Sequence, residues 1–315
     1  MRNNRPPSLN VAFVFDPKTD YLDQGYSITE CGDLADDITI NGISSALKEL
    51  GHNVVQVPGI KTLVDHLAAD TQKEWDIVFN FGEGVTGSAR ESQIPALLEA
   101  YDVPFTFSDA ATLALCIDKG KTKMALDHYQ IPTSPFFIVP QLGAPVDYST
   151  LQEKLPYPLF AKPVAASTSN GITASNKITR KEKFRDVIEG LRAQFPAQQI
   201  LVEPFLAGRE FTVGILGTGE NSRVLGVSEV TGYNPEGQED GEPIDFATIF
   251  SKSGGVPGKY MEHIRVDVED LLVKQVSQVA LQAYKAVDCR DAGRVDIRLG
   301  SGAVGSTPYV IEART

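Results

Sequence analysis

Segments with strand and helix patterns alternate at short intervals over the first third of the chain. The predicted strands are 9–15, 53–57, 75–81 and 103–106, and the predicted helices are 37–50, 63–69 and 91–101. Such alternation is typical of βαβ units, in which consecutive strands run parallel and each helix crosses over one face. We therefore expect an amino-terminal α/β domain, residues 1–108, built on a parallel sheet.

Two further units are expected, at 109–205 and 206–315. The central unit is predicted to contain helices at 118–129 and 180–195 and strands at 136–139, 159–162 and 199–202. The last is predicted to contain strands at 209–216 and 223–230, a helix at 268–287 and a closing pair of strands. Residues 231–259 are rich in glycine and proline with little periodicity, which is typical of a functional lid or of disorder.

Composition limits the classes of function. A chain of 315 residues, 42% of them hydrophobic, can bury a large core. The net charge of −12 argues against binding to nucleic acid or to an anionic membrane. Cys31, Cys116 and Cys289 lack metal-ligand spacing, which favours a reducing compartment. With no apolar run long enough to cross a bilayer and no secretory signal pattern, we expect a cytoplasmic protein.

Two acidic residues stand inside apolar runs near the end of the chain. Asp296 lies in 293–298 and Glu312 in 311–313, and the intervening 300–306 has the composition of a turn. The two runs are expected to pair as a hairpin, which would place the carboxylates side by side. Adjacent carboxylates repel unless a cation lies between them, so a hard-metal site is one interpretation. The alternative is that each side chain points into water.

Lysine placement suggests an anion site. Lys162 ends the apolar run 158–161, and an ammonium there needs an anionic partner. The loop 164–171 that follows is rich in hydroxyls and suits polyphosphate oxygens. Lys119 opens a predicted helix, where a cation opposes the helix dipole and hints at a bound anion. A snorkelling lysine and a solvated helix face are the ordinary alternatives.

The segment after the predicted strand 199–202 combines an acid with apolar residues. Phe205 and Leu206 could cover the face of a purine, with Glu203 beside them and Glu210 within reach of a ribose. An ordinary domain linker is the alternative. Two matches to G-x-G-x-x-G, at 82–87 and 300–305, differ in context, and the first does not follow the first strand as a dinucleotide fingerprint should.

Read together, these segments resemble the D-alanine–D-alanine ligase family of the ATP-grasp superfamily. The similarity covers most of the chain, and the matching segments follow one another in the family's order. They are 76–84, 90–99, 103–106, 115–119 with Lys123, 160–163, 203–206, 208–213, 293–296 and 311–313.

The resemblance implies an α/β protein with the ATP-grasp fold, in which an amino-terminal parallel α/β domain precedes two α+β subdomains that clamp ATP. It implies ATP and Mg²⁺ as cofactors, with Mn²⁺ as an alternative, and two amino acids as substrates. It also implies a carboxylate–amine ligase that forms an acyl phosphate and releases ADP and phosphate. A homodimer is left open.

The family pattern also assigns roles to individual residues. Lys119 and Lys162 would contact the nucleotide, and Ser167, Thr168, Ser169 and Gly171 would form the loop over its phosphates. Glu203, Phe205 and Leu206 would hold the adenine, Glu210 the ribose, and Asp296 and Glu312 the metal. Arg294 would face the developing oxyanion, and Ser169 joins it as a catalytic residue.

Some positions depart from the family pattern. Arg314 stands where the family has an asparagine, and the sequence ends at Thr315, before the turn and helix that the pattern continues with. Lys252 or Lys259 would replace a missing lysine in 245–250. Glu30, Asp33, Asp36 and Asp37 are unranked candidates for gripping the first amino group. These departures leave two alternatives open: a nucleotide-binding homologue without activity, and a ligase with a different amine or hydroxy acceptor.

Overall fold

The computed structural model describes residues 7–28, 30–167, 170–233, 260–267 and 269–315, and it divides into two compact units, Met1–Ala114 and Leu115–Thr315. The strands of the first unit are β1 (Asn10–Phe15), β2 (Asn53–Pro58) and β3 (Ile77–Phe81). Its helices are α1 (Lys18–Asp23), α2 (Asp37–Glu49), α3 (Gly59–Ala68) and α4 (Gln93–Ala100), and α5 (Ala110–Ile117) spans the boundary between the units.

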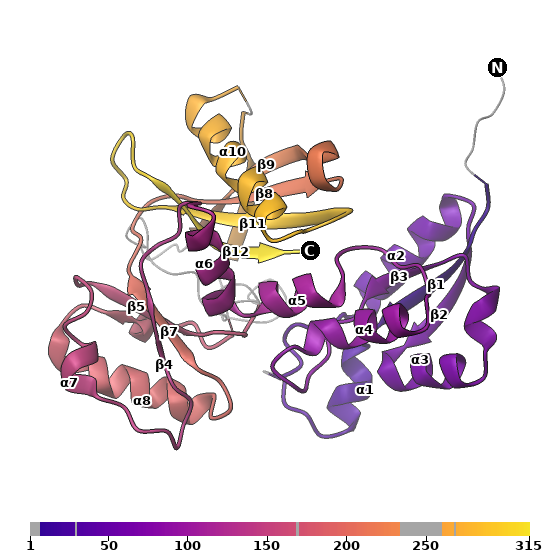
Figure 1. Ribbon diagram of the computed structural model, residues 1–315, viewed down its shortest axis with the longest axis horizontal. Helices are drawn as coiled ribbons and strands as arrows, with labels where there is room; N and C mark the ends of the chain where they lie inside the picture. Colours follow the sequence, from indigo (N-terminus) through magenta and orange to yellow (C-terminus); the bar gives the residue numbers. More distant parts are fainter. Residues whose placement is uncertain (1–6, 29, 168–169, 234–259, 268) are drawn as a thin grey trace. The chain divides into compact units, whose positions relative to one another are not determined.

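The sheet of the first unit has the order β2-β1-β3, and both pairings are parallel, which confirms the predicted parallel sheet (Figure 1). Consecutive side chains on β1 point to opposite faces, so Ala12 and Val14 enter one buried cluster and Phe13 and Phe15 another. Trp75 belongs to the first cluster, with its ring centroid 5.0 Å from that of His66. Each face of the sheet therefore has its own apolar core.

The second unit contains two antiparallel sheets. The first has the order β4-β7-β5-β6. Its strands are β4 (Phe137–Val139), β5 (Leu159–Pro163), β6 (Lys177–Ile178) and β7 (Ile200–Pro204), and α6 (Lys119–His128) and α7 (Tyr148–Leu151) precede β5 in the chain. Helix α8 (Phe184–Gln194) packs on this sheet through Phe184, Ile188 and Leu191, which repeat at helical spacing and are buried.

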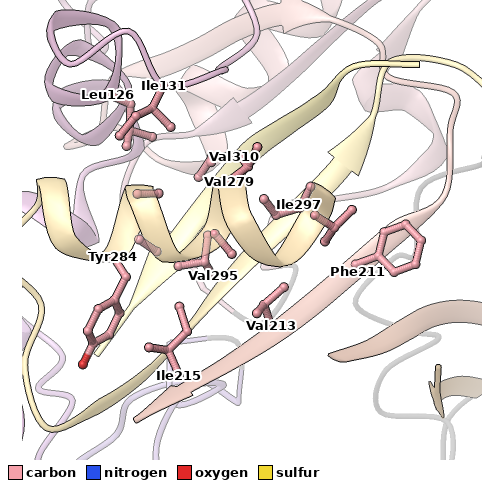
Figure 2. Close-up of a cluster of buried hydrophobic side chains, with 14 of the residues drawn as sticks. Leu126, Ile131, Phe211, Val213, Ile215, Val279, Tyr284, Val295, Ile297 and Val310 are labelled. Atoms are coloured by element: carbon pink, nitrogen blue, oxygen red, sulfur yellow. The ribbon is translucent and has the colours of Figure 1, made fainter. Parts of the chain in front are cut away.

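The second antiparallel sheet has the order β10-β9-β8-β11-β12. Its strands are β8 (Glu210–Leu216), β9 (Arg223–Tyr233), β10 (Tyr260–Arg265), β11 (Ala292–Leu299) and β12 (Pro308–Arg314). The apolar side chains of one face pack against α10 (Leu271–Ala286), and Figure 2 shows Phe211, Val213 and Val295 in this cluster beside Tyr284 of the helix. The opposite face of the same strands is left for polar side chains.

Two details differ from the expectations. Residues 103–106 form only an isolated parallel bridge between Phe105 and Val78, because Pro104 has no N–H to continue the ladder. Helices α1, α5 and α7 and strands β6 and β10 (Tyr260–Arg265) were not predicted. The expected lid lies mostly at 234–259, outside the described residues. The division of residues 109–315 into two domains at 205 and 206 stays a prediction.

Candidate functional site

The polar face of the five-stranded sheet carries charged side chains on alternate positions of three neighbouring strands. On β8 and β11 the pairing places Glu210 opposite Arg298 and Thr212 opposite Asp296. On β12, Glu312 stands opposite Asp296. The intervening residues of these strands are the core residues on the other face. The alternation therefore turns the back of the hydrophobic core into a charged surface.

Asp296 and Glu312 form the acid pair that the hairpin predicted. Both are largely buried, and the Thr212 hydroxyl donates a hydrogen bond of 2.8 Å to Asp296 Oδ1. Burial raises the pKa of Asp296 to about 6; Glu312 opposite adds to this effect, and Arg294 partly opposes it. Arg294 is half-exposed, with its Nε 3.5 Å from Asp296 Oδ2. Asp296 is therefore the less compensated carboxylate of the pair.

Glu312 has stronger partners. Lys119 Nζ lies 2.9 Å from Glu312 Oε1, and Arg314 Nε lies 3.3 Å from the same oxygen. Burial alone would raise the pKa of Glu312, but these two cations outweigh it and hold the pKa well below its usual range. The two carboxylates thus differ in character although they face each other.

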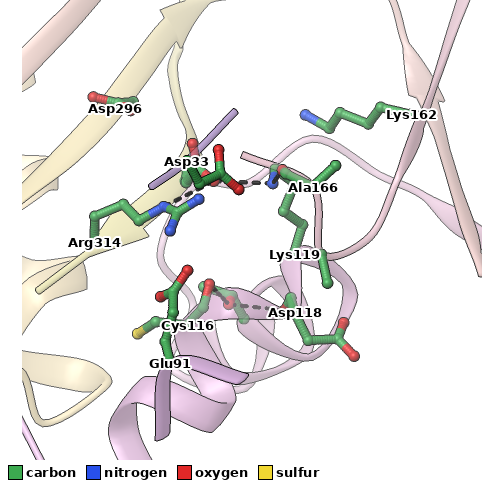
Figure 3. A network of polar contacts seen from close by, with 12 residues as sticks. Asp33, Glu91, Cys116, Asp118, Lys119, Lys162, Ala166, Asp296 and Arg314 are labelled. Carbon is green, nitrogen blue, oxygen red and sulfur yellow. Dashed lines mark hydrogen bonds and ion pairs between the residues drawn. The ribbon is translucent and has the colours of Figure 1, made fainter. Parts of the chain in front are cut away.

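Lys119 is positioned by the start of α6, as predicted. Asp118 caps this helix by accepting from the Lys121 N–H at 3.1 Å, and Lys119 is the first helical residue. Its ammonium also donates to the Ala166 carbonyl at 2.6 Å. Burial lowers the pKa of Lys119, against the pull of Glu312. Figure 3 shows Lys119 with Lys162, Asp296 and Arg314 in a close view of these polar contacts.

A second buried ionic group holds Lys162. Glu203 on β7 accepts Lys162 Nζ at 2.8 Å on one oxygen and Lys123 Nζ at 2.9 Å on the other. Burial opposes the charge on Glu203, but the two ammonium groups hold its pKa at about 2. The anionic partner that the sequence required for Lys162 is therefore Glu203. Lys123 was not predicted as part of this group, because helical spacing gives no sign that a lysine is buried.

The two ionic groups open into one pocket of the second unit. Its apolar part is lined by Phe160, Ile172, Phe205 and Leu206. Its polar part includes Lys119, Lys162, Glu203, Asp296 and Glu312. The Phe205 ring lies 4.4 Å from Lys177 Nζ and 5.6 Å from the Arg298 guanidinium, measured to the ring centroid. Arg298 also pairs with Glu210 at 3.0 Å. The pocket thus joins an apolar cleft to a strip of charges.

The family model described as D-ala D-ala ligase C-terminus matches residues 126–312, well over half of the chain. The chain belongs to the D-alanine–D-alanine ligase family. The resemblance read from the sequence is thereby confirmed.

Similar proteins agree with this assignment. A D-alanine–D-alanine ligase of Rhodospirillum rubrum is 26% identical over 272 residues, covering 86% of this chain and 79% of the relative. One from Bordetella petrii is 29% identical over 259 residues, covering 82% and 70%. The crystal structure of the Bacillus anthracis enzyme complexed with ATP matches the fold with a TM-score of 0.67 at 19% identity, covering 98% of this chain and 86% of that one.

Most of the residues that the family pattern selected line this pocket. These are Lys119, Lys162, Ser167, Glu203, Phe205, Leu206, Glu210, Arg294, Asp296 and Glu312. Thr168 and Ser169 lie outside the described residues, as do 245–250, Lys252 and Lys259. Gly171 is not among the residues that line the pocket, and a Cβ there would meet the Phe195 ring at 2.4 Å. The individual roles stay predictions.

The glycine-rich stretch 82–87 has a structural explanation in the first unit. The backbone N–H groups of Glu83 and Gly84 both donate at 2.9 Å to one oxygen of Asp16, a buried residue just after β1. Tyr21 donates to the other oxygen at 2.7 Å. A side-chain carboxylate therefore occupies the donors that a phosphate would need in a dinucleotide site.

Three of the four candidate acids for gripping a substrate amino group have local partners. Asp36 caps α2 by accepting from the Thr39 N–H at 2.8 Å, and Glu30 accepts from Ser27 at 2.7 and 2.9 Å. Asp33 pairs with the buried Arg90 at 2.9 Å. Asp37 lies in the first turn of α2. These contacts explain the acids structurally and do not rank them for a substrate.

Proposed function

We propose that this chain is an ATP-dependent carboxylate–amine ligase that joins two amino acids, with D-alanine as the first substrate to test. The observation that carries the proposal is the pocket in which Lys119 and Lys162 face the Asp296–Glu312 pair. Lysines attract phosphate oxygens and paired acids attract a hard cation, so the pocket suits a metal-bound polyphosphate.

The acid pair fits Mg²⁺ by its donor chemistry. Mg²⁺ is usually bound by one or two carboxylates, with phosphate oxygens and water completing its octahedron. The described residues hold no group of three or more acidic, histidine or cysteine side chains that could form a complete cage. Asp296 and Glu312 would therefore hold the ion jointly with the nucleotide. A bound ion supplies neutralisation of the charge that develops on the transferred phosphoryl group.

The rest of the pocket suits a nucleotide. The apolar part at Phe205 and Leu206 has room for the faces of a base, and Glu210 can accept from ribose hydroxyls. Lys119 and Lys162 would turn toward the phosphates, leaving Glu312 to the metal and Glu203 to Lys123. Because both lysines are buried, their charges act with little screening by water.

The reaction would proceed in two steps. A carboxylate oxygen of the first substrate attacks the γ-phosphorus, the bond to the β-phosphate oxygen breaks, and ADP leaves. The amine of the second substrate attacks the acyl carbon of the resulting acyl phosphate, phosphate leaves with the bonding electrons, and the amine loses a proton. Arg294, half-exposed at the edge of the acid pair, is placed to donate to the acyl oxygen as it becomes negative.

The direct test measures ADP and phosphate release with Mg²⁺ and a panel of D- and L-amino acids, with mass spectrometry of the products. The proposal expects a dipeptide that depends on both ATP and Mg²⁺, with D-alanyl-D-alanine as the first product to seek. Lys162→Met should raise the KM for ATP at least tenfold, because the phosphates lose a buried cation. ATP binding without product across the whole panel would contradict the ligase.

One observation favours the alternative of a nucleotide-binding protein without activity. Arg314 and Lys119 already neutralise Glu312, so this acid is less available to a metal than Asp296. Extending the panel to peptides and hydroxy acids tests the remaining alternative of a different acceptor.

We also keep a homodimer and a cytoplasmic location as proposals. The three buried free cysteines are consistent with a reducing compartment, and sedimentation measures the assembly.

Helices long and apolar enough to span a bilayer are absent from the part of the chain that the structure describes.

A further inference from the structure

Two arginines stand in register beside the acid pair. Arg294 and Arg314 are directly opposite each other on β11 and β12, two positions before Asp296 and two after Glu312. Alternate residues of a strand share a face, so a row of two cations lies next to a row of two anions. Like charges directly opposite are unfavourable in a sheet unless opposite charges lie nearby. Each arginine therefore has one acid of the pair as its charge partner.

The two arginines are unequal. The Arg314 side chain is only 17% exposed and its Nε lies 3.3 Å from Glu312, on the acid that Lys119 also contacts. The Arg294 side chain is 49% exposed and lies farther from its acid, at 3.5 Å. Arg314 is therefore a built-in cation at the Glu312 end of the pair, whereas the Asp296 end has a weaker cationic neighbour.

A guanidinium keeps its charge at every physiological pH and has no lone pair to offer a metal. It therefore repels a cation at its own position and cannot become a ligand. Two-metal phosphoryl-transfer sites place their ions about 4 Å apart and need anionic oxygens around both. Here the pair supplies two carboxylates, and four acids and four cations line the pocket. Arg314 is not among the lining residues and acts on the pocket through Glu312, which it contacts at 3.3 Å. Glu312, whose oxygens a second ion would need, already has two cationic partners in Lys119 and Arg314.

We propose that this site binds one divalent cation per nucleotide and that the Arg314 guanidinium takes the place of a second ion. Asp296 and Glu312 would hold the single ion, and the Arg314 guanidinium beside Glu312 would supply the positive charge that a second ion would bring. This inference rests on the proposed function, because it assumes that a nucleotide occupies the pocket.

The test counts bound ions without turnover. The chain is saturated with the non-hydrolysable analogue AMP-PNP, and Mn²⁺ is titrated while free Mn²⁺ is followed by electron paramagnetic resonance. We expect one bound Mn²⁺ per chain in the wild type and in Arg314→Lys, which keeps a cation. Arg314→Asn should bind two, with the affinity of the second ion increased at least tenfold. The matched control Arg223→Asn, at an exposed position of β9, should bind one.

The outcomes separate the two proposals. Two ions in the wild type, or one ion in an Arg314→Asn protein that still binds AMP-PNP, would overturn the role of Arg314. Failure of the wild type to bind AMP-PNP at all would instead refute the nucleotide site, and the ligase with it. If Arg314→Asn does not fold, Arg314→Gln is counted in the same way, and one ion there overturns the inference.

Discussion

The buried carboxylates of this protein differ in how far neighbouring cations compensate their charge. Asp296 is buried with weak cationic compensation, whereas Glu312 and Glu203 each lie between two cations. A buried carboxylate without a close cation destabilises the fold, and one between cations stabilises it relative to losing a partner. Removing the charge should therefore change the stability of the fold in opposite directions at the two ends of the acid pair.

Asp296→Asn should reduce turnover at least a hundredfold. The same substitution should stabilise the ligand-free protein at pH 7.5. The folded pKa of Asp296 is about 6, above the unfolded value of 3.8, so the charged form is disfavoured in the fold. The free-energy cost of the charged Asp296 is absent below pH 3.8, increases between pH 3.8 and about pH 6, and is constant at higher pH. The gain is at most about 3 kcal/mol. Urea unfolding at pH 7.5 and pH 4 measures it, and a gain that persists at pH 4 would contradict the cause.

Glu312→Gln provides the matched comparison for that result. The pKa of Glu312 is lowered in the fold, so its stabilising contribution is complete above the unfolded value of 4.5 and is lost progressively as the pH falls below it. At pH 7.5 the substitution leaves buried Lys119 without its carboxylate, and we expect a loss of about 3 kcal/mol. Equal effects of the two substitutions in urea would show that the acids are equivalent.

Glu203→Gln should destabilise the second unit by about 3–5 kcal/mol, because Lys123 and Lys162 would share no carboxylate. The folded pKa of Glu203 is about 2 and the unfolded value is 4.5, so the stabilisation is complete above pH 4.5 and is lost as the pH falls toward 2. Calorimetry at pH 7.5 measures the loss. Glu269→Gln, in the exposed pair with Lys274, is the control and should unfold like the wild type.

At the scale of elements, one sheet serves two purposes. Its β8, β11 and β12 strands bury apolar residues against α10 and present the charged residues on the reverse face. The geometry of the acid pair depends on the register of β11 against β12, which shifts at a bulge between Asp296 and Ile297. A change that displaces β12 should therefore damage both the core and the site.

Gly293→Ala tests this dependence. A Cβ at Gly293 would lie 2.4 Å from the Arg314 carbonyl oxygen and 3.0 Å from the Tyr284 ring, so β12 or α10 has to move. We expect a loss of about 1–3 kcal/mol from overpacking and at least a tenfold loss of turnover. Gly226→Ala on β9 of the same sheet meets nothing within 4 Å and should leave turnover unchanged. Thermal unfolding and ADP release measure both variants.

At the scale of the whole molecule, two compact units have separate cores, and the candidate site belongs to the second. Ligand binding should therefore stabilise the second unit first. With AMP-PNP and Mg²⁺ at 100 times the dissociation constant, the gain is about 2.7 kcal/mol. Scanning calorimetry should show an upward shift of the transition of this unit, and Lys162→Met should remove the shift. An unchanged trace for the wild type would contradict nucleotide binding at this pocket.

Local patterns predicted the parts of the structure that depend on neighbouring residues. Alternation along 293–298 and 311–313, with a turn between them, sufficed to place Asp296 opposite Glu312. The helix predicted at 118–129 corresponds to α6, which begins at Lys119 after the capping Asp118. The parallel sheet of the first unit followed from the alternation of helices and strands.

Contacts between distant segments could not be predicted in this way. Lys123 and Glu203 are 80 positions apart, and nothing in the helical pattern of 119–128 marks Lys123 as buried. The same holds for Glu210 with Arg298 and for Lys119 with Glu312. The Asp16 carboxylate on the glycine-rich loop was equally hidden, because a strand end and a loop 67 positions away meet only in the folded sheet.

The position of the single tryptophan has a practical consequence for spectroscopy. Trp75 is the chain's one indole, and it is packed in the core of the first unit beside His66. Its fluorescence emission therefore reports the unfolding of that unit. The second unit, which carries the pocket, has no tryptophan, and its emission comes from tyrosines. A denaturation curve recorded at indole wavelengths would miss loss of the pocket, and a tryptophan introduced at Phe205 would supply a signal from it.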